Sequence, residues 1–217
     1  MWLSEGFATY FAGLFIEKYE GQAAFQDYMK RAAQSVFSYE KQSLTPIHDT
    51  ATQDLFQLLN PNNYQKGAWA LHMLRGQMGD DKFFQGIKLY YESRRHGTAT
   101  TEDLRAVLEQ SSGQNLREFF QRWIYDTGHP RYAFSYRWTA AGKDSGALTI
   151  FLDQKQANAP FLMPVPVTLT LAGGKTRQLT LTPTGRQSVW SFPKMPQPLK
   201  VQFDADETLL KEIAAKP

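Results

Sequence analysis

Glu5 lies in a sequence context that suggests chemistry. The segment around it carries apolar side chains on nearly every face before Glu17, a pattern typical of a buried helix. Because burying an unpaired carboxylate costs several kcal/mol, such a group must meet a cation or a metal ion, or stay protonated. Alternatively, Glu5 is an acid in the first turn of the helix, where the backbone amides and the helix dipole favour it. The residue pattern alone leaves both interpretations open.

Tyr64 and the histidines are the other residues whose types could do chemistry. A preorganised hydroxyl can stabilise a developing oxyanion, but Tyr64 taken alone is more simply an aromatic residue at a helix start capped by Asn62 or Asn63. The histidines lie at positions 48, 72, 96 and 129, and none has a second histidine one helical turn away. We expect His72 in the core. His48 lies in a loop, and substrate contact is its less favoured role.

Composition excludes several classes of function. The 24 basic and 21 acidic residues are scattered along the chain, so no nucleic-acid surface is indicated. The absence of cysteine excludes disulfides, thiolate metal sites and a cysteine nucleophile. No apolar run reaches the roughly 18 residues that a membrane span requires. We expect a soluble protein, and the sequence does not distinguish cytoplasm from periplasm or secretion.

The hydrophobic period changes near residue 130. Residues 1–130 repeat at helical spacing and predict about six helices, with Gly79 and Gly97 as helix ends and Thr101 as an N-cap. Residues 131–205 alternate and predict a small antiparallel β-sandwich, and residues 206–217 predict a short helix or a frayed tail. The fold class is therefore α+β with two segregated parts. Its predicted strands are YAFSYRW, ALTIFL, PVPVTLTL, TRQLTLT, QSVWSF and LKVQF.

Residues 2–10, WLSEGFATY, resemble the W-L-N-E-G-F-A motif of the gluzincin aminopeptidases, the family of aminopeptidase N and the leukotriene hydrolase/aminopeptidase. In that family an H-E-x-x-H helix supplies two histidine zinc ligands and a glutamate base, and a glutamate in this motif is the third ligand. The resemblance implies that Glu5 is a zinc ligand. The one departure is Ser4, where asparagine is commoner, and it does not affect the ligand.

Two further segments resemble the same family in the same order. Residues 63–68, NYQKGA, resemble its Y-x-K-G-A segment, which implies that Tyr64 donates a proton to the oxyanion formed during peptide hydrolysis. Residues 119–130, FFQRWIYDTGHP, resemble the helix that closes the catalytic domain before a β-sandwich. The resemblance covers most of residues 1–130 and, at the level of fold, residues 131–205. It implies the C-terminal helical part of a gluzincin catalytic domain followed by a sandwich.

Neither H-E-x-x-H nor the family's amine-binding G-x-M-E-N strand occurs in this sequence. We therefore expect a C-terminal fragment of an aminopeptidase that begins just after the H-E-x-x-H helix. The intact enzyme would hold one zinc ion and cleave N-terminal residues from peptides. A single carboxylate does not hold zinc, so we expect this chain alone to be inactive and not to retain the metal. We also expect it to self-associate through an exposed first helix.

The sequence also allows two alternative functions. The first is a non-catalytic interaction or scaffold module that uses the same fold without its chemistry. The second is a carbohydrate-binding sandwich, suggested by Tyr136, Trp138 and Trp190. We favour a core role for these three aromatic residues.

Overall fold

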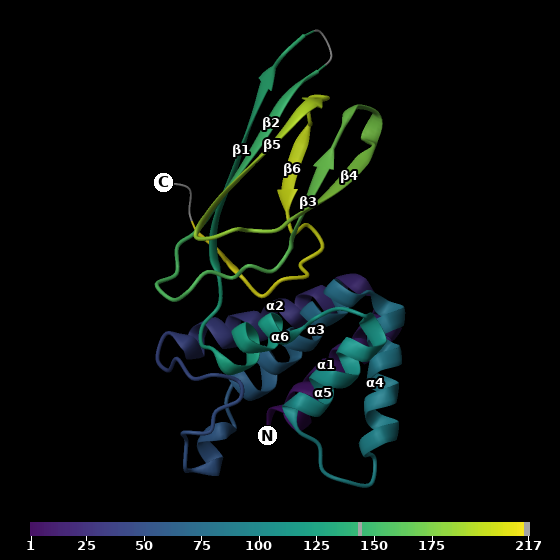
Figure 1. The fold of residues 1–217 in the computed structure, drawn as a ribbon, viewed down its shortest axis with the longest axis vertical. Coiled ribbons are helices and arrows are strands. Elements are labelled where there is room, and N and C mark those ends of the chain that lie inside the picture. The colour runs from purple at the N-terminus through teal and green to yellow at the C-terminus, as the bar shows by residue number, and fades with distance from the viewer. Residues whose placement is uncertain (143–144, 215–217) are drawn as a thin grey trace. The chain divides into compact units, whose positions relative to one another are not determined.

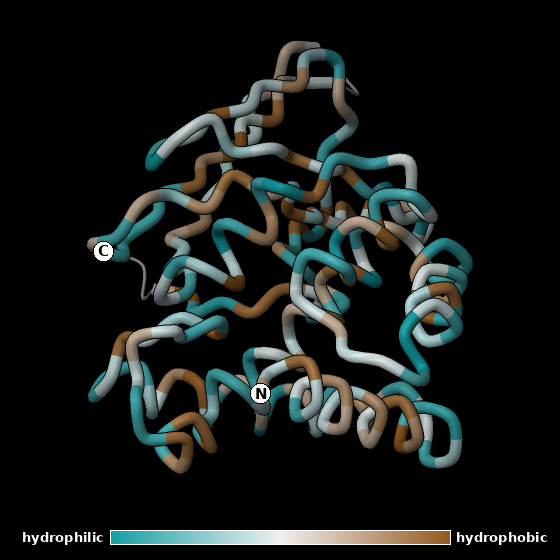
Figure 2. The backbone as a smooth tube through the Cα atoms, turned by 60° about the horizontal axis from the view of Figure 1, so that its bottom comes forward, coloured by the Kyte–Doolittle hydropathy of each residue, from teal (hydrophilic) through white to brown (hydrophobic). Residues whose placement is uncertain are grey.

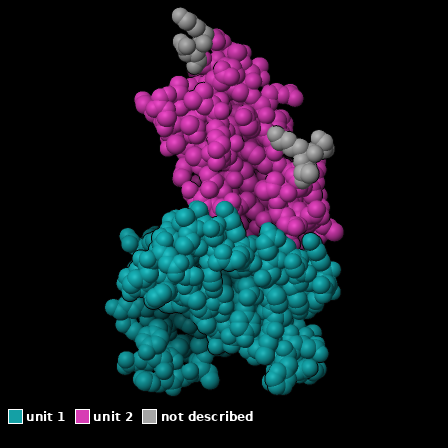
Figure 3. All heavy atoms as spheres, turned by 180° about the vertical axis from the view of Figure 1, so that it is seen from behind, with its two compact units in different colours: residues 1–128 teal, residues 129–217 magenta. Residues whose placement is uncertain are grey.

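The structure is a computed structural model that describes residues 1–142 and 145–214 (Figure 1). The chain divides into two compact units, Met1–Gly128 and His129–Pro217 (Figure 3). The first is helical and the second consists of strands, so the predicted α+β class is confirmed. Apolar residues recur among polar ones along the helices (Figure 2). No described helix is both long and apolar enough to cross a membrane.

The first unit contains long helices joined by short turns. The helices are α1 (Trp2–Glu20), α2 (Gln22–Glu40), α3 (Gly67–Met78), α4 (Asp80–Arg94), α5 (Thr101–Ser112) and α6 (Arg117–Phe120). The turns are η1 (Leu55–Leu58), η2 (Asn62–Lys66) and η3 (Gln121–Tyr125). Gly21 and Gly79 separate consecutive helices at φ values of 93° and 81°. Side chains other than glycine rarely adopt these values, so the two glycines fix these helix ends.

The core of the helical unit is aromatic. Tyr10 is fully buried, and its hydroxyl lies 3.2 Å from Nδ1 of His72. The His72 ring also packs against Phe25 and Trp69, with ring centroids 5.2 and 5.4 Å away. His72 is therefore a core residue, as its apolar surroundings predicted. A buried polar ring of this kind is tolerated because it has a hydrogen-bonding partner.

Helix α1 is buried on one side only, so the expectation that it is buried all round is wrong for this chain. It packs against α2 and α3, and its buried residues are Trp2, Gly6, Tyr10 and Gly13. Phe11 and Phe15 are 46% and 61% exposed. An apolar helix is buried all round only where neighbouring elements cover every face. No element within residues 1–142 or 145–214 covers the face of α1 that carries Phe11 and Phe15.

Helix α5 begins one residue earlier than its sequence suggested. Thr100, rather than Thr101, is the N-cap, and it forms a capping box with Asp103. The Thr101 hydroxyl instead accepts a hydrogen bond from the indole N–H of Trp2 at 2.9 Å, which ties the start of α1 to the start of α5. The preceding helix, α4, ends at Arg94, before the predicted Gly97. Side-chain contacts between the helices therefore decide these ends.

The second unit holds two sheets. Its strands are β1 (Arg131–Ala140), β2 (Gly146–Gln154), β3 (Val165–Thr170), β4 (Thr176–Leu181), β5 (Gln187–Met195), β6 (Lys200–Phe203) and β7 (Glu212–Ile213). One sheet has the order β5-β2-β1-β7 and the other β4-β3-β6. All six predicted strands are present. Only the β1–β7 pair is parallel among the described strands, and alternating residues from both sheets form the core.

The tail does not form the predicted short helix. Glu212 and Ile213 pair with β1 as strand β7. Buried Asp204 turns the chain before this strand, because its carboxylate accepts hydrogen bonds from the backbone N–H groups of Thr208 and Leu209. The backbone N–H groups of Glu212 and Ala214 donate to the carbonyls of Pro130 and Tyr132, so they are not available for helix hydrogen bonds. Residues 215–217 of the predicted tail lie outside the described residues.

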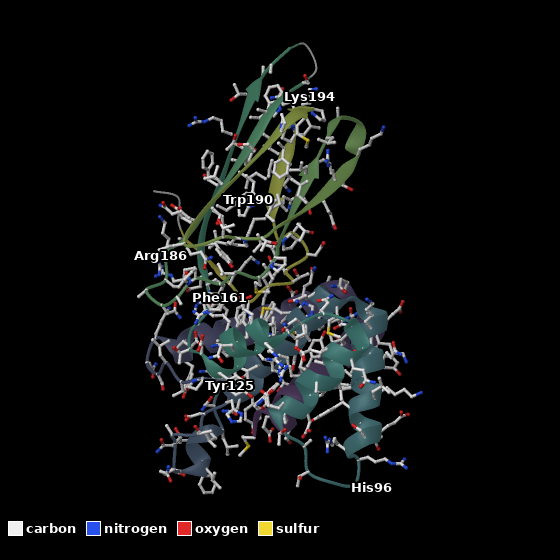
Figure 4. The ribbon with its side chains drawn as sticks, in the orientation of Figure 1. His96, Tyr125, Phe161, Arg186, Trp190 and Lys194 are labelled. Carbon is white, nitrogen blue, oxygen red and sulfur yellow. The ribbon has the colours of Figure 1, made fainter. Side chains whose placement is uncertain are left out.

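The aromatic residues of the sandwich divide by burial. Trp138 and Trp190, the latter labelled on β5 in Figure 4, are partly buried and pack against the sandwich core. The Trp138 indole N–H also donates to the backbone carbonyl of Met195 at 3.3 Å. Tyr136, in contrast, is 44% exposed. The core role expected for the two tryptophans is confirmed, and that expected for Tyr136 is wrong because its strand position faces outward.

Candidate active site

Glu5 and Tyr64 meet in the folded chain. Glu5 lies in the first turn of α1 and is half-buried, and Tyr64 lies in η2, which packs against α1. Desolvation and a hydrogen bond to the Glu5 carboxylate both raise the pKa of the Tyr64 phenol. A tyrosine phenol is protonated at neutral pH even at its ordinary pKa, and this shift keeps it a hydrogen-bond donor to still higher pH. The two residues that the sequence singled out therefore lie side by side.

A contact between two glycines brings these residues together. A Cβ atom added to Gly6 would lie 3.1 Å from Cα of Gly67, and one added to Gly67 would lie 3.1 Å from Cα of Gly6. The backbones of α1 and α3 therefore touch. Gly6 follows Glu5 directly, and Gly67 follows the turn that carries Tyr64. A residue with a side chain at either position would force the two elements apart.

Gly6→Ala should therefore destabilise the chain by about 1–3 kcal/mol, the usual cost of inserting a methyl group into a packed contact. Urea unfolding monitored by circular dichroism measures this free energy. Gly97→Ala is the matched control, because a Cβ at Gly97 meets open space. Equal stability of the two variants would contradict the close approach.

The turn that carries Tyr64 is an unusual one. Residues 62–66 form a π-helical turn, a geometry found frequently at functional sites. The side-chain oxygen of Asn60 accepts from the backbone N–H groups of Asn62 and Asn63 at 2.9 and 3.3 Å. The side-chain amide of Asn62 donates to the backbone carbonyl of Thr45 at 2.6 Å. Side chains therefore fix the start of this turn from both directions.

A buried ion pair holds the end of the same turn. Nζ of Lys66 lies 2.6 Å from Oε1 of Glu40 and 2.9 Å from the backbone carbonyl oxygen of Gly128. The side chains of Lys66 and Glu40 are 0% and 2% exposed. Burial lowers the pKa of Lys66, and the Glu40 carboxylate opposes that shift. Sequence reasoning missed this pair, although Lys66 lies in the K-G-A part of the motif that identified Tyr64.

Glu5 offers one metal ligand, and the described residues do not offer a full set. Within residues 1–142 and 145–214, no group of three or more His, Cys, Asp or Glu side chains could hold a metal ion. His48 is held in the fold, with Nδ1 3.2 Å from the Thr101 hydroxyl and its ring 5.1 Å from that of Tyr125, which Figure 4 labels. His96 is exposed in the loop after α4. A single carboxylate fits one position of a zinc site only.

Comparison with known proteins places this geometry in a family. Residues 1–123 match the peptidase family M1 domain. The "Probable aminopeptidase 2" of Sulfurisphaera tokodaii is 28% identical over 198 residues, which are 82% of this chain and 23% of that protein. The mitochondrial "Aminopeptidase 2" of Saccharomyces cerevisiae is 28% identical over 134 residues, 60% of this chain and 14% of that protein.

A solved structure shares the fold. The crystal structure of Legionella pneumophila aminopeptidase A in complex with aspartic acid matches 100% of this chain with a TM-score of 0.73 and 16% identity, over 24% of its own chain. This chain thus spans less than a quarter of the length of these relatives. The family match covers more than half of the chain and includes both Glu5 and Tyr64. The chain belongs to peptidase family M1, the gluzincin aminopeptidase family that its motifs resembled.

Proposed function

We propose that this chain supplies the third zinc ligand, Glu5, and the oxyanion donor, Tyr64, of an aminopeptidase that removes N-terminal residues from peptides. The observation that carries this proposal is the contact between the two side chains across α1 and η2. The two histidine ligands and the glutamate base are absent from the sequence and would come from outside it. An in-frame H-E-x-x-H encoded upstream of this chain in its gene tests the proposal, and an upstream region without one contradicts it.

Each of the two side chains has a distinct part in the reaction. Zinc, when bound, polarises the scissile carbonyl and lowers the pKa of a bound water. Glu5 contributes negative charge and one oxygen ligand. Tyr64 is protonated at neutral pH, as any tyrosine is, so its hydroxyl can donate to the oxygen that becomes negative as water attacks the peptide carbonyl. The contact with Glu5 holds the phenol beside the place where that oxygen would form.

The chain by itself should neither retain zinc nor hydrolyse aminoacyl-coumarin substrates, because it offers one ligand where a catalytic site needs three and lacks a general base. Equilibrium dialysis against zinc, followed by metal analysis, checks the first statement, and a fluorescence assay checks the second. Glu5→Gln is the matched control and should behave like the unaltered chain in both measurements. Turnover that a chelator abolishes would contradict the prediction.

We further propose that the isolated chain self-associates through the apolar face of α1. Besides Phe11 and Phe15, this face borders a groove of about 520 Å³ between α1 and α4. Apolar side chains line most of the groove, among them Phe7, Phe84, Ile87 and Tyr90. Contiguous apolar surface of this kind favours association in water.

Phe15→Ser should therefore reduce the oligomeric fraction, since it removes a large exposed ring from this face. Light scattering coupled to size-exclusion chromatography measures the mass as a function of concentration. Phe56→Ser is the control, because Phe56 is 81% exposed in η1 and not on α1. A chain that remains monomeric at all concentrations would refute the association.

A further inference from the structure

The buried Lys66–Glu40 pair joins three distant parts of the helical unit. Glu40 is the last residue of α2, Lys66 is the last residue of η2, and Gly128 ends the unit. Nζ of Lys66 bonds to the Glu40 carboxylate and to the Gly128 carbonyl at once. Arg122 of η3 acts electrostatically on Lys66 and pairs with Asp126 at 3.1 Å. The two bonds therefore fix both the position of the Lys66 ammonium group and the direction in which the side chain extends.

Stability alone does not account for a fully buried lysine. Removing two charges from water is costly, and apolar residues of similar volume often serve a core equally well or better. An apolar side chain at position 66 would fill the space but would not fix the rotation of the turn about its axis. A turn that slipped by one residue would rotate by roughly a quarter of a revolution and move the Tyr64 phenol away from Glu5. The pair has the geometry to prevent that slip.

The opposite end of the turn is fixed independently. The backbone N–H of Lys66 donates to the Pro61 carbonyl at 2.9 Å, and Asn60 holds the two residues that precede Tyr64. Gly67, directly after Lys66, touches the backbone of Gly6. These contacts set the distance between η2 and α1, and the ion pair sets the rotation of η2.

We propose that Lys66, through its bonds to Glu40 and the Gly128 carbonyl, is a positioning residue that holds the Tyr64 phenol beside Glu5. This inference rests on the function proposed for Tyr64 and deepens it. Lys66 itself lies fully buried, so it acts on the reaction only through the residue that it orients. The same pair also secures the last residue of the helical unit, Gly128, against the turn that bears Tyr64.

Nuclear magnetic resonance of the chain labelled at its tyrosine rings, in buffer containing a chelator, tests the proposal. Tyr64→Phe assigns the Tyr64 ring signal. In the unaltered chain, that signal should show nuclear Overhauser contacts to the Glu5 side chain and should shift in Glu5→Gln. Lys66→Met combined with Glu40→Leu removes both buried charges together, so no unpaired charge is left in the core.

The expected result is that this double variant folds and that its Tyr64 ring loses the nuclear Overhauser contacts to Glu5. The Tyr64 ring signal should then no longer shift when Glu5→Gln is added to the double variant. Glu17→Gln, which removes the negative charge of the Arg75–Glu17 pair elsewhere in the unit, should keep the contacts. Tyr10, buried in the core near Arg75, is the internal reference and its ring signal should not move in the double variant.

Two outcomes would overturn the proposal. The double variant keeps the contacts of Tyr64 to Glu5, or the double variant fails to fold, which would make the pair a requirement of the fold itself. This readout needs neither zinc nor turnover. If Tyr64 proves unnecessary for catalysis while the double variant loses the contacts, the proposed function fails and the positioning by Lys66 stands.

Discussion

Tyr64→Phe is expected to lower kcat of the assembled enzyme by about 100- to 1,000-fold, the loss typical of removing one oxyanion donor. The substitution deletes a single hydroxyl and leaves the ring to pack in η2. Because the oxyanion exists only in the transition state and the intermediate, KM should change little. Turnover of an aminoacyl-coumarin measures the rate, and metal analysis should find zinc content unchanged. The assembled enzyme is the one proposed above, in which this chain acts together with residues that supply the two histidine ligands and the glutamate base.

Tyr125→Phe is the matched control for that experiment. Tyr125 lies in the same unit, and its hydroxyl also bonds to a carboxylate, that of Glu102 at 2.7 Å. Its pKa is likewise raised, to about 12, by desolvation and by Glu102. This variant should keep full activity, because the Tyr125 hydroxyl bonds to Glu102, a different acid from Glu5. An unchanged rate in Tyr64→Phe, or an equal loss in both variants, would show that the assignment of Tyr64 is wrong.

Glu5→Gln in the assembled enzyme is expected to weaken zinc binding by at least about 100-fold, the upper end of the loss seen when a residue that merely supports a ligand is removed. The amide keeps the size of the side chain but loses its charge, so the metal loses one of three protein ligands. Competition with a chelating dye measures the affinity. Activity should fall in parallel and should recover partly when zinc is added in excess.

Glu17→Gln is the control for this second experiment. Glu17 lies on the same helix as Glu5 but pairs with Arg75 at 2.6 Å, away from Tyr64. Its loss should leave zinc affinity unchanged and lower stability only modestly, because the pair is partly exposed. A Glu5→Gln enzyme that binds zinc as tightly as the unaltered one would exclude Glu5 as a ligand. The metal would then have to be held entirely by residues outside this chain.

Features of the fold that depend on neighbouring residues in the chain could be predicted from the sequence. The change of period near residue 130 and the six predicted strands depend on the alternation of neighbouring side chains. Predictions failed where a distant partner decides the outcome. The tail became β7 because β1 and the residue before it captured its backbone groups, and the cap of α5 shifted because Thr101 instead bonds to Trp2.

In the candidate site, too, some features depend on the sequence alone and others on contacts between distant residues. The types of Glu5 and Tyr64, and the family motifs around them, are properties of the sequence, and so is the identity of the glycines beside them. Only the tertiary structure brings the two side chains together, through the backbone contact of α1 with α3 and the buried Lys66–Glu40 pair. Contacts between residues far apart in the chain depend on how the helices pack, and hydrophobic spacing along one helix does not specify which side chain it will meet. The sequence by itself therefore determined which groups could act, and the packing of three helical segments decided that they lie at one place.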